Sequence, residues 1–189
     1  MKKPELLGVE EKHKGWAKFL IASIRLADGQ VVTREIEDHG NAVAVLPYDP
    51  VRRTAIVVRQ FRTPILYVGE DPMLIEAIAG LAEGDDPMAC ARREAMEEAG
   101  LRLEKIECVA RGWSMPGIST ERMDLFLAVY APADRVTAGG GLAEEHEDIE
   151  VIELPLSELA AMADSGKLID VKTFALIQTL RVRRPELFS

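Results

Sequence analysis

Apolar and polar residues follow one another along most of the chain in short runs that predict β-strands. Apolar residues concentrate at 17–25 and 30–36, on either side of Asp28-Gly29, a pair that favours a tight hairpin turn. Before this hairpin, the first 16 residues are polar, and they are expected to form an arm or part of a subunit interface. The same kind of run predicts further strands at 42–47, 54–61, 74–78, 104–112, 124–131 and 149–154.

Three other segments have the residue spacing of helices. Asp86-Pro87 supplies an N-cap residue followed by proline at the first helical position, and Gly100 supplies a C-terminal stop. Between them one apolar face is formed by residues three and four positions apart: Met88, Ala91, Ala95 and Ala99. Two helices follow at 156–164 and about 170–182. Strands combined with a central helix and terminal helices predict an α/β fold with a mixed β-sheet.

The composition is that of an ordinary globular protein. The chain has 189 residues, 48% hydrophobic and 29% charged, enough for one domain with a substantial core. No apolar run approaches the length of about 18 residues that a transmembrane helix needs, and the N-terminus lacks the apolar stretch of a signal peptide. Cys90 and Cys108 form no CxxC motif, which favours a reducing compartment, so we expect a cytoplasmic protein without membrane partners.

The charge of the chain is unevenly distributed. With 23 Lys and Arg against 32 Asp and Glu, the net charge is −9, which argues against nucleic-acid binding because phosphates require clustered basic residues. Residues 83–98 carry a net charge of −4 and residues 141–150 carry −5, so the rest of the chain is balanced. Charge runs are usually solvated surface. A cation-binding site is the alternative that this concentration favours.

Three carboxylates lie on the polar side of the helix predicted after Asp86. Glu94 and Glu98 are four positions apart and Glu97 is three from Glu94, so the three share one side. Like charges at this spacing repel, and acids in the last turn also face the negative end of the helix dipole. A hard divalent cation such as Mg²⁺ would reverse both effects. An exposed acidic helix, balanced by Arg92 and Arg93, explains the helix geometry equally well.

A longer motif around this helix gives a family resemblance. The segment from Ala79 to Leu101 resembles the Nudix box, G-x5-E-x7-R-E-U-x-E-E-x-G-U, where U is apolar. The second half matches in full from Arg93 to Leu101. The first half is one residue shorter when Asp85 is set against the box glutamate, and that residue is Asp. This difference concerns the loop before the helix and leaves the helical acids in place.

Other segments are similar to nucleotide-sugar pyrophosphatases of the Nudix family. Arg59 to Arg62 resembles their R-Q-F-R strand and Ser114 to Glu121 their S-P-G-x-S-x-E segment. The 16-residue spacing from Gly100 to Pro116 is a mark of the ADP-ribose branch, whereas Gly139-Gly140-Gly141 and the acids after it are similar to the GDP-mannose branch. The resemblance implies a Nudix fold, a mixed sheet between helices with an N-terminal antiparallel hairpin region. It places a dimerising arm and hairpin at 1–38 and the hydrolase domain at 39–189.

The resemblance also implies a chemistry. Its members hydrolyse nucleoside diphosphate sugars to a nucleoside monophosphate and a sugar phosphate with Mg²⁺, for which Mn²⁺ can substitute. Glu94, Glu98 and the backbone carbonyl of Ala79 are the expected metal ligands, and Glu97 is a third carboxylate ligand or an orienting residue. Glu147 is the expected catalytic base or a further ligand. Its competitors are Glu144, Glu145, His146 and Glu150, and the glycine run before them is expected to be a mobile loop that closes over substrate.

Further residues are carried over as substrate contacts. Arg62 can bind a phosphate bidentately, and Arg34, Glu35 and Lys172 are possible nucleotide-sugar contacts, although Arg34 can equally be a surface charge. Two more residues have open alternatives. Glu121 is a substrate or metal-shell residue, or else a loop cap near Gly117. Trp16 stacks on a purine or packs at a dimer interface. Arg93 is expected to pair with a box acid and to hold the preceding loop.

Several functions compete at this point. The leading hypothesis is a Mg²⁺-dependent pyrophosphatase and homodimer acting on a nucleoside diphosphate sugar, with GDP-mannose and ADP-ribose as the nearest substrates. The second hypothesis is a general hydrolase that acts on several nucleoside diphosphate derivatives. A catalytically silent ADP-ribose sensor is disfavoured because Glu94, Glu97 and Glu98 are all present. A Ca²⁺-binding module is disfavoured because no D-x-[DN]-x-[DN]-G loop occurs.

Overall fold

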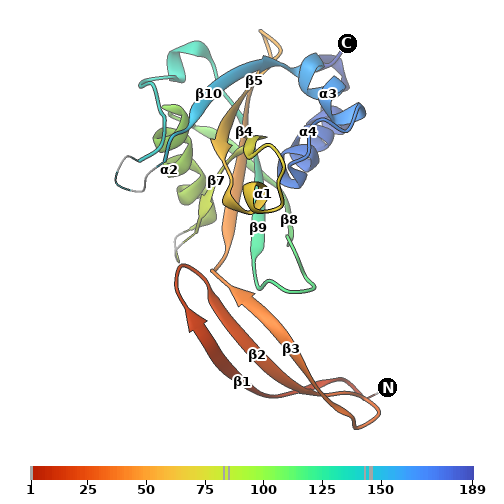
Figure 1. The fold of residues 1–189 in the computed structure, drawn as a ribbon. Helices are drawn as coiled ribbons and strands as arrows, with labels where there is room; N and C mark the ends of the chain where they lie inside the picture. The colour runs from red at the N-terminus through yellow and green to blue at the C-terminus, as the bar shows by residue number, and fades with distance from the viewer. Residues whose placement is uncertain (1, 83, 85, 143, 145–146) are drawn as a thin grey trace. The chain divides into compact units, whose positions relative to one another are not determined.

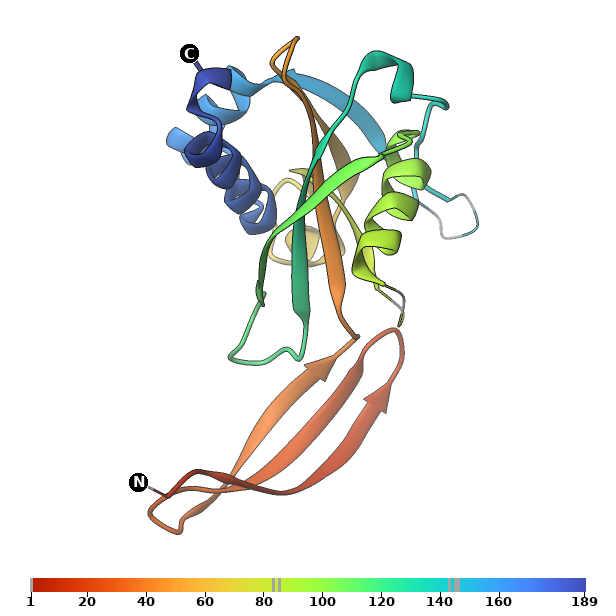
Figure 2. The same cartoon turned by 180° about the vertical axis from the view of Figure 1, so that it is seen from behind.

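The computed structural model describes residues 2–82, 84, 86–142, 144 and 147–189, and the chain folds into two compact units (Figures 1 and 2). The first unit comprises Met1–Asn41 and Gly112–Met123. The second comprises Ala42–Arg111 and Asp124–Ser189. The predicted boundary at residue 38 concerns the same part of the chain, but the first unit also takes in a segment from the middle of the sequence.

The first unit contains an antiparallel sheet in the order β1-β2-β3, coloured red to orange in Figure 1. Its strands are β1 (Glu5–Lys14), β2 (Lys18–Arg25) and β3 (Val31–Asp38). The predicted hairpin turn lies between β2 and β3, where Gly29 has φ 91° and Asp28 accepts a hydrogen bond from the amide of Gln30. The polar arm predicted at the N-terminus is largely a strand, β1, so the hairpin region has three strands.

The segment from Gly112 to Met123 belongs to this unit because it is hydrogen-bonded to β3. The amide of Glu37 donates to the carbonyl of Ile118 (2.9 Å), and the amide of Thr120 donates to the carbonyl of Glu37 (3.0 Å). Ser119 Oγ also donates to the Glu37 carboxylate (2.7 Å). These bonds give the S-P-G-x-S-x-E-like segment a fixed place beside the end of β3.

The second unit is built on a β-sheet, which has seven strands among the described residues. Five of them lie in the order β10-β5-β4-β9-β8, and β6 pairs with β5 and β7 with β4. Its strands are β4 (Ala42–Asp49), β5 (Thr54–Phe61), β6 (Met73–Glu76), β7 (Ile78–Leu81), β8 (Lys105–Trp113), β9 (Arg122–Val129) and β10 (Glu150–Pro155). Its helices are α1 (Thr63–Tyr67), α2 (Pro87–Ala99), α3 (Leu156–Asp164) and α4 (Val171–Arg183), with 3-10 turns at Pro132–Asp134 and Pro185–Leu187. The sequence pattern does not predict α1, and none of its residues is buried.

Helices cover both faces of this sheet. Figures 1 and 2 show α2 on one side and α3 with α4 on the other. The face of α2 toward the sheet consists mainly of Ala91, Ala95 and Ala99, all completely buried against a core that includes Val43 and Val58. Because alanine side chains are short, the helix can lie close to the strands. The predicted α/β fold with a sheet between helices is confirmed, and no helix of the described residues is long and apolar enough to cross a membrane.

Candidate active site

The helix that carries the predicted metal ligands has the predicted ends. Asp86 caps α2 by accepting a hydrogen bond from the amide of Ala89 (3.0 Å), and Gly100 ends it in the left-handed conformation at φ 66°. Glu94 and Glu98 are on the buried side, with 8% and 3% of their surfaces exposed. The alternative of an exposed acidic helix is therefore wrong for these two residues. Burying a carboxylate is unfavourable unless its charge is paired or hydrogen-bonded.

Gly80 on β7 leaves room for one of these carboxylates. A Cβ atom at Gly80 would lie 2.1 Å from Cδ of Glu94, far inside any allowed contact. On the same strand, the amide of Ala79 donates a hydrogen bond to Oε2 of Glu98 (3.3 Å). The first glycine of the box thus lets the helix place a carboxylate directly over the strand, beside the backbone of Ala79.

Arg93 connects the acids to the loop that precedes the helix. Its guanidinium lies 2.8 Å from Oε1 of Glu94 and 3.0 Å from Oε2 of Glu97, and Nη2 also donates to the carbonyl of Leu81. The predicted pairing of Arg93 with box acids is confirmed, and its bond to Leu81 holds the end of β7, directly before the loop. Glu97 is half-buried, so its ion pair with Arg93 is only partly screened by water.

The acids from the helix and from the later loop interact with one another. Burial, and then the negative charges of Glu94 and Glu147, raise the pKa of Glu98 from its ordinary 4.5 to about 8. The amide of Ala79 and the charge of Arg62 oppose this rise only in part. Glu94 and Glu147 therefore lie close enough to Glu98 to disfavour its charge, as a shared cation site would require.

The three acids are each held by a different partner. Glu94 pairs with Arg93, Glu98 accepts from Ala79, and Oε2 of Glu147 accepts from the amide of Leu142 (2.9 Å). No set of three His, Cys, Asp or Glu among the described residues is gathered at ligating distance. The donors are nevertheless hard oxygens in a buried place with surplus negative charge, and such a donor set fits a divalent cation such as Mg²⁺.

The glycine run has a structural role that differs from the predicted mobile loop. The amide of Gly140 donates to the carbonyl of Glu98 (2.8 Å), and that of Gly141 donates to the carbonyl of Glu97 (3.1 Å). A Cβ at position 139 would lie 2.4 Å from the carbonyl oxygen of Glu98, so only glycine fits there. The run satisfies carbonyls that every helix leaves open at its C-terminus.

The other candidates for the base differ in position. Glu150 is exposed on β10 and pairs with Arg59, whose Nε donates to it at 2.8 Å. Glu144 is exposed. Glu145 and His146 lie outside the described residues, as does Asp85, the residue set against the box glutamate.

Arg62 and Lys172 meet at a buried acid that sequence reasoning missed. Nε and Nη2 of Arg62 donate to the two carboxylate oxygens of Glu76 (2.5 and 2.9 Å), and Lys172 Nζ contacts the same carboxylate and Asp170 (3.0 Å). Arg62 was predicted to bind a phosphate bidentately, and in the structure its Nε and Nη2 bind the carboxylate of Glu76. The only sequence signal for Glu76 was an acid at a strand position that should be apolar.

The remaining predicted contacts are in the first unit. The exposed ring of Trp16 stacks on His39 with centroids 4.8 Å apart and planes 20° apart. His39 lies between two carboxylates: Nε2 is 2.8 Å from Glu121 and Nδ1 is 2.5 Å from Glu37. Although burial opposes the charged ring, these hydrogen bonds raise the pKa of His39. Glu121 is thus a buried partner of His39.

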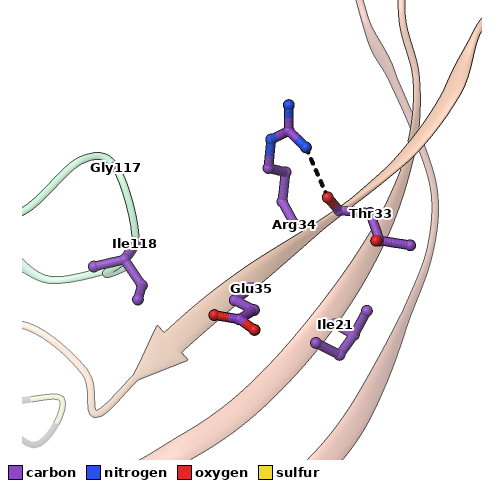
Figure 3. A pocket seen from close by; sticks show the side chains of 6 residues that line it. All are labelled: Ile21, Thr33, Arg34, Glu35, Gly117 and Ile118. Carbon is purple, nitrogen blue, oxygen red and sulfur yellow. Dashed lines mark hydrogen bonds between the residues drawn. The ribbon is translucent and has the colours of Figure 1, made fainter.

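Arg34 and Glu35 lie on the exposed surface of β3 at the edge of a hollow. Figure 3 shows the hollow between the strands and the segment around Gly117 and Ile118, with Arg34 donating to the carbonyl of Thr33 (2.8 Å). The predicted site residues accordingly form two sets. One set is on the first unit, and the other, with Arg62, Lys172 and the acids, is on the second.

Comparisons with known proteins agree with the motif. The NUDIX domain model matches residues 38–175. The chain belongs to the Nudix family. The GDP-mannose pyrophosphatases of Cronobacter sakazakii and Salmonella arizonae are 43% and 40% identical over 159 and 158 residues, covering 82% of this chain and 82% of each relative. That of Klebsiella pneumoniae is 42% identical over 158 residues, covering 82% and 79%.

A solved structure extends the likeness of this Nudix hydrolase to the whole fold. The crystal structure of an ADP compounds hydrolase has a TM-score of 0.77 and 17% sequence identity, and the match covers 98% of this chain and 96% of that one. At such identity the match concerns the fold. It includes the N-terminal sheet, which lies mostly outside the residues matched by the domain model.

Proposed function

We propose that this Nudix hydrolase is a Mg²⁺-dependent pyrophosphatase that cleaves a nucleoside diphosphate sugar into a nucleoside monophosphate and a sugar phosphate. The observation that carries the proposal is the burial of Glu94 and Glu98 on one helix of the second unit, with Glu147 close enough for its charge to disfavour that of Glu98. The names of relatives about 40% identical favour GDP-mannose as the substrate. ADP-ribose is the second substrate to test, and a cytoplasmic location accords with both.

The metal ligands of the proposal are Glu94, Glu98, Glu147 and the carbonyl of Ala79. When bound, a divalent cation neutralises phosphate oxygens and activates the attacking water. Mg²⁺ is the first choice because it prefers a few carboxylates completed by water and phosphate oxygens, and Mn²⁺ is the expected substitute. Burial, and then the charges of Glu94 and Glu147, raise the pKa of Glu98, and a cation would stabilise this arrangement because it offsets both effects.

The chain's own groups divide the remaining work. Glu147 is proposed to take the proton of the water that attacks one phosphorus, while the bridging oxygen leaves with the other phosphoryl group. Only one of its oxygens is bound by the amide of Leu142, so the other can accept that proton. Glu97 is proposed to act through Arg93, which it holds against Glu94. Arg62 and Lys172 are proposed to bind phosphoryl oxygens with the donors that Glu76 does not use.

The first unit is proposed to supply contacts to the nucleotide sugar and to form a homodimer. Trp16 offers an exposed aromatic face, already stacked on His39, for a base or a partner surface. Arg34 and Glu35 line the hollow of Figure 3 and offer donors and acceptors to a sugar or a base. Glu121 is proposed to act through His39. The proposed domains remain 1–38 for dimerisation and 39–189 for hydrolysis.

Removal of the metal is expected to abolish turnover. A panel of nucleoside diphosphate sugars, including GDP-mannose and ADP-ribose, is incubated with the protein and the released monophosphate is measured. Activity should disappear with EDTA and return with excess Mg²⁺, because the phosphate charge and the three acids would otherwise repel one another. Full activity in EDTA would contradict the metal mechanism, and no hydrolysis of any compound with Mg²⁺ would leave a silent binding protein.

Deletion of residues 1–16 is expected to lower the molecular mass in solution to that of a monomer. The deletion removes β1 and leaves β2, an inner strand, as an exposed edge. Sedimentation velocity of the two chains measures the change. Trp16→Ala in the full chain is the companion variant: a raised KM at unchanged mass would assign the ring to substrate. If neither variant changes the mass in solution or KM, the role proposed for residues 1–16 in dimerisation and substrate binding is wrong.

A further inference from the structure

Among the described residues of the second unit, Glu76 at the end of β6 has the most deeply buried charge. Only 1% of its surface is exposed, and its carboxylate contacts two cations, Arg62 and Lys172. Burial opposes ionisation, but these cations hold the pKa of Glu76 below its ordinary value, so it stays a carboxylate. An acid in such a place is an expensive feature that a purely structural role seldom requires.

Glu76 is held on a rigid frame. Its strand pairs with β5, where Glu76 lies opposite Val58. The next residue, Ala77, donates its amide to Oγ1 of Thr173 (2.5 Å), and Thr173 in turn bonds the N-cap of α4, Asp170. The backbone that carries this carboxylate is therefore held by both a strand pair and a helix end.

Each cation keeps donors that Glu76 does not use. Arg62 gives Nε and Nη2 to Glu76, and its Nη1 makes no hydrogen bond within the part of the chain that the structure describes. Lys172 has three donor hydrogens and two acceptors, on Glu76 and Asp170. Nη1 of Arg62 and one donor hydrogen of Lys172 are therefore not used by Glu76 or Asp170. Arg62 is close enough to Glu98 for the two charges to affect each other's pKa.

An independent observation indicates that an acceptor-bearing ligand enters beside these cations. Gln60 is 8% exposed, and its Nε2 is the one buried side-chain nitrogen or oxygen without a partner among the described residues. Val58 and Gln60 on β5 are at alternate positions with Arg62, which directly follows the strand and keeps an extended backbone (φ −127°, ψ 109°), so the three share a face. A buried amide without an acceptor is costly. The free donors of Gln60, Arg62 and Lys172 are what the oxygens of a diphosphate would satisfy.

We propose that Glu76 is a positioning residue that holds Arg62 and Lys172 in the orientation that binds the diphosphate. This inference rests on the proposed function of the same site. The carboxylate of Glu76 neutralises part of the charge of Arg62 and Lys172, so that the two cations can lie close to one another when no substrate is bound. It also uses the donors of Arg62 that would otherwise bind solvent or the acids of α2, and so leaves a defined edge for phosphoryl oxygens.

The test compares Glu76→Gln with wild type in kcat, KM and anion binding. We expect kcat/KM on the hydrolysed nucleoside diphosphate sugar to fall about 100-fold, because small displacements of binding groups cost about that much. KM should rise as well as kcat fall, since Arg62 and Lys172 bind the ground state too. Binding of inorganic pyrophosphate with Mg²⁺, measured by calorimetry, should weaken about tenfold, or 1.4 kcal/mol.

Controls separate positioning from folding. Glu153→Gln removes another carboxylate held by an arginine, and the partners of Glu153 among the described residues are Arg52, Tyr130 and Thr54, none of them an acid of α2. It should lose thermal stability and keep kcat/KM. Glu76→Asp keeps the charge with a shorter side chain and should recover part of the activity if Glu76→Gln folds poorly.

A double-mutant cycle gives the decisive result. If Glu76 acts through Arg62, the double variant Arg62→Lys with Glu76→Gln should be little worse than Arg62→Lys alone. Additive losses, or unchanged kcat/KM and pyrophosphate binding in a folded Glu76→Gln, would overturn the proposal. If wild type hydrolyses no nucleoside diphosphate sugar, the proposed function fails, and pyrophosphate binding still decides whether Glu76 positions the two cations.

Discussion

Glu98→Gln is expected to lower kcat about 1000-fold or more, since removing an interaction that stabilises transition-state charge costs several kcal/mol. Glutamine has the same shape but carries no charge, so the fold should persist. The structure makes this residue the most consequential acid, because it is 3% exposed and interacts with both Glu94 and Glu147. Initial rates at saturating substrate and Mg²⁺ measure the loss.

The same substitution should stabilise the metal-free protein at alkaline pH. The pKa of Glu98 is about 8 in the folded protein, against an ordinary value of 4.5. Between these values the folded state binds more protons than the unfolded state, so stability falls as pH rises. Glutamine resembles the protonated acid and lacks this titration. The variant should therefore match wild type near pH 5 and exceed it above pH 8, by about 3 °C in Tm or more.

Two measurements complete this prediction. Mg²⁺ should raise the Tm of wild type at pH 8 more than that of Glu98→Gln, because the cation offsets a charge that the variant lacks. Glu158→Gln, on the exposed side of α3, is the matched control and should change neither kcat nor the pH dependence of Tm. Near-normal turnover by Glu98→Gln would remove Glu98 from the metal ligands.

The substitution Gly80→Ala should lower kcat/KM about 100-fold with little loss of stability, because displacement of a reacting group by about 1 Å has a cost of that size. The added methyl group would lie 2.1 Å from Cδ of Glu94. That carboxylate is the end of a flexible side chain, so it can move aside without unfolding the helix. Activity is lost because Glu94 can no longer lie over β7. Kinetics together with thermal denaturation separate the two effects.

Gly112→Ala is the matched control for this substitution. No heavy atom lies within 4 Å of a Cβ built at Gly112, and its φ is not positive, so alanine fits without strain. The control should keep both activity and Tm. A large fall in Tm for Gly80→Ala would mean that the glycine serves packing, and unchanged kinetics would mean that Glu94 functions from another position.

Local signals in the sequence predicted the elements that have strong ends or strong periodicity. Asp86-Pro87 and Gly100 delimit α2 as expected, because a capping carboxylate and a left-handed glycine act through neighbouring residues. β1 was not predicted as a strand because all ten of its residues are exposed, so its sequence has no alternation of buried apolar and exposed polar residues. The helix α1 was not predicted because none of its residues is buried either.

The candidate site was predictable where a motif carries it and unpredictable where a partner comes from a distant strand. The acids of α2 follow from the box. Glu76 was missed because its meaning depends on Arg62 and Lys172, which are 14 and 96 residues away in the chain. His39 was missed because its two carboxylate partners come from β3 and from the segment before β9. Such partners become visible only when the chain is folded.

The hydrogen bonds from Gly140 and Gly141 to the end of α2 join the loop before Glu147 to the helix that carries Glu98. We expect the two segments to unfold locally in a single cooperative step. A movement that lifts the glycines also exposes the carbonyls of Glu97 and Glu98, so the loop cannot leave as a free flap. Any swing of Glu147 that keeps the helix end covered must arise after Gly141. The amide hydrogens of Gly140 and Gly141 should therefore exchange at the same rate as those of the last turn of α2. Ligand binding at the acids should slow exchange in both segments.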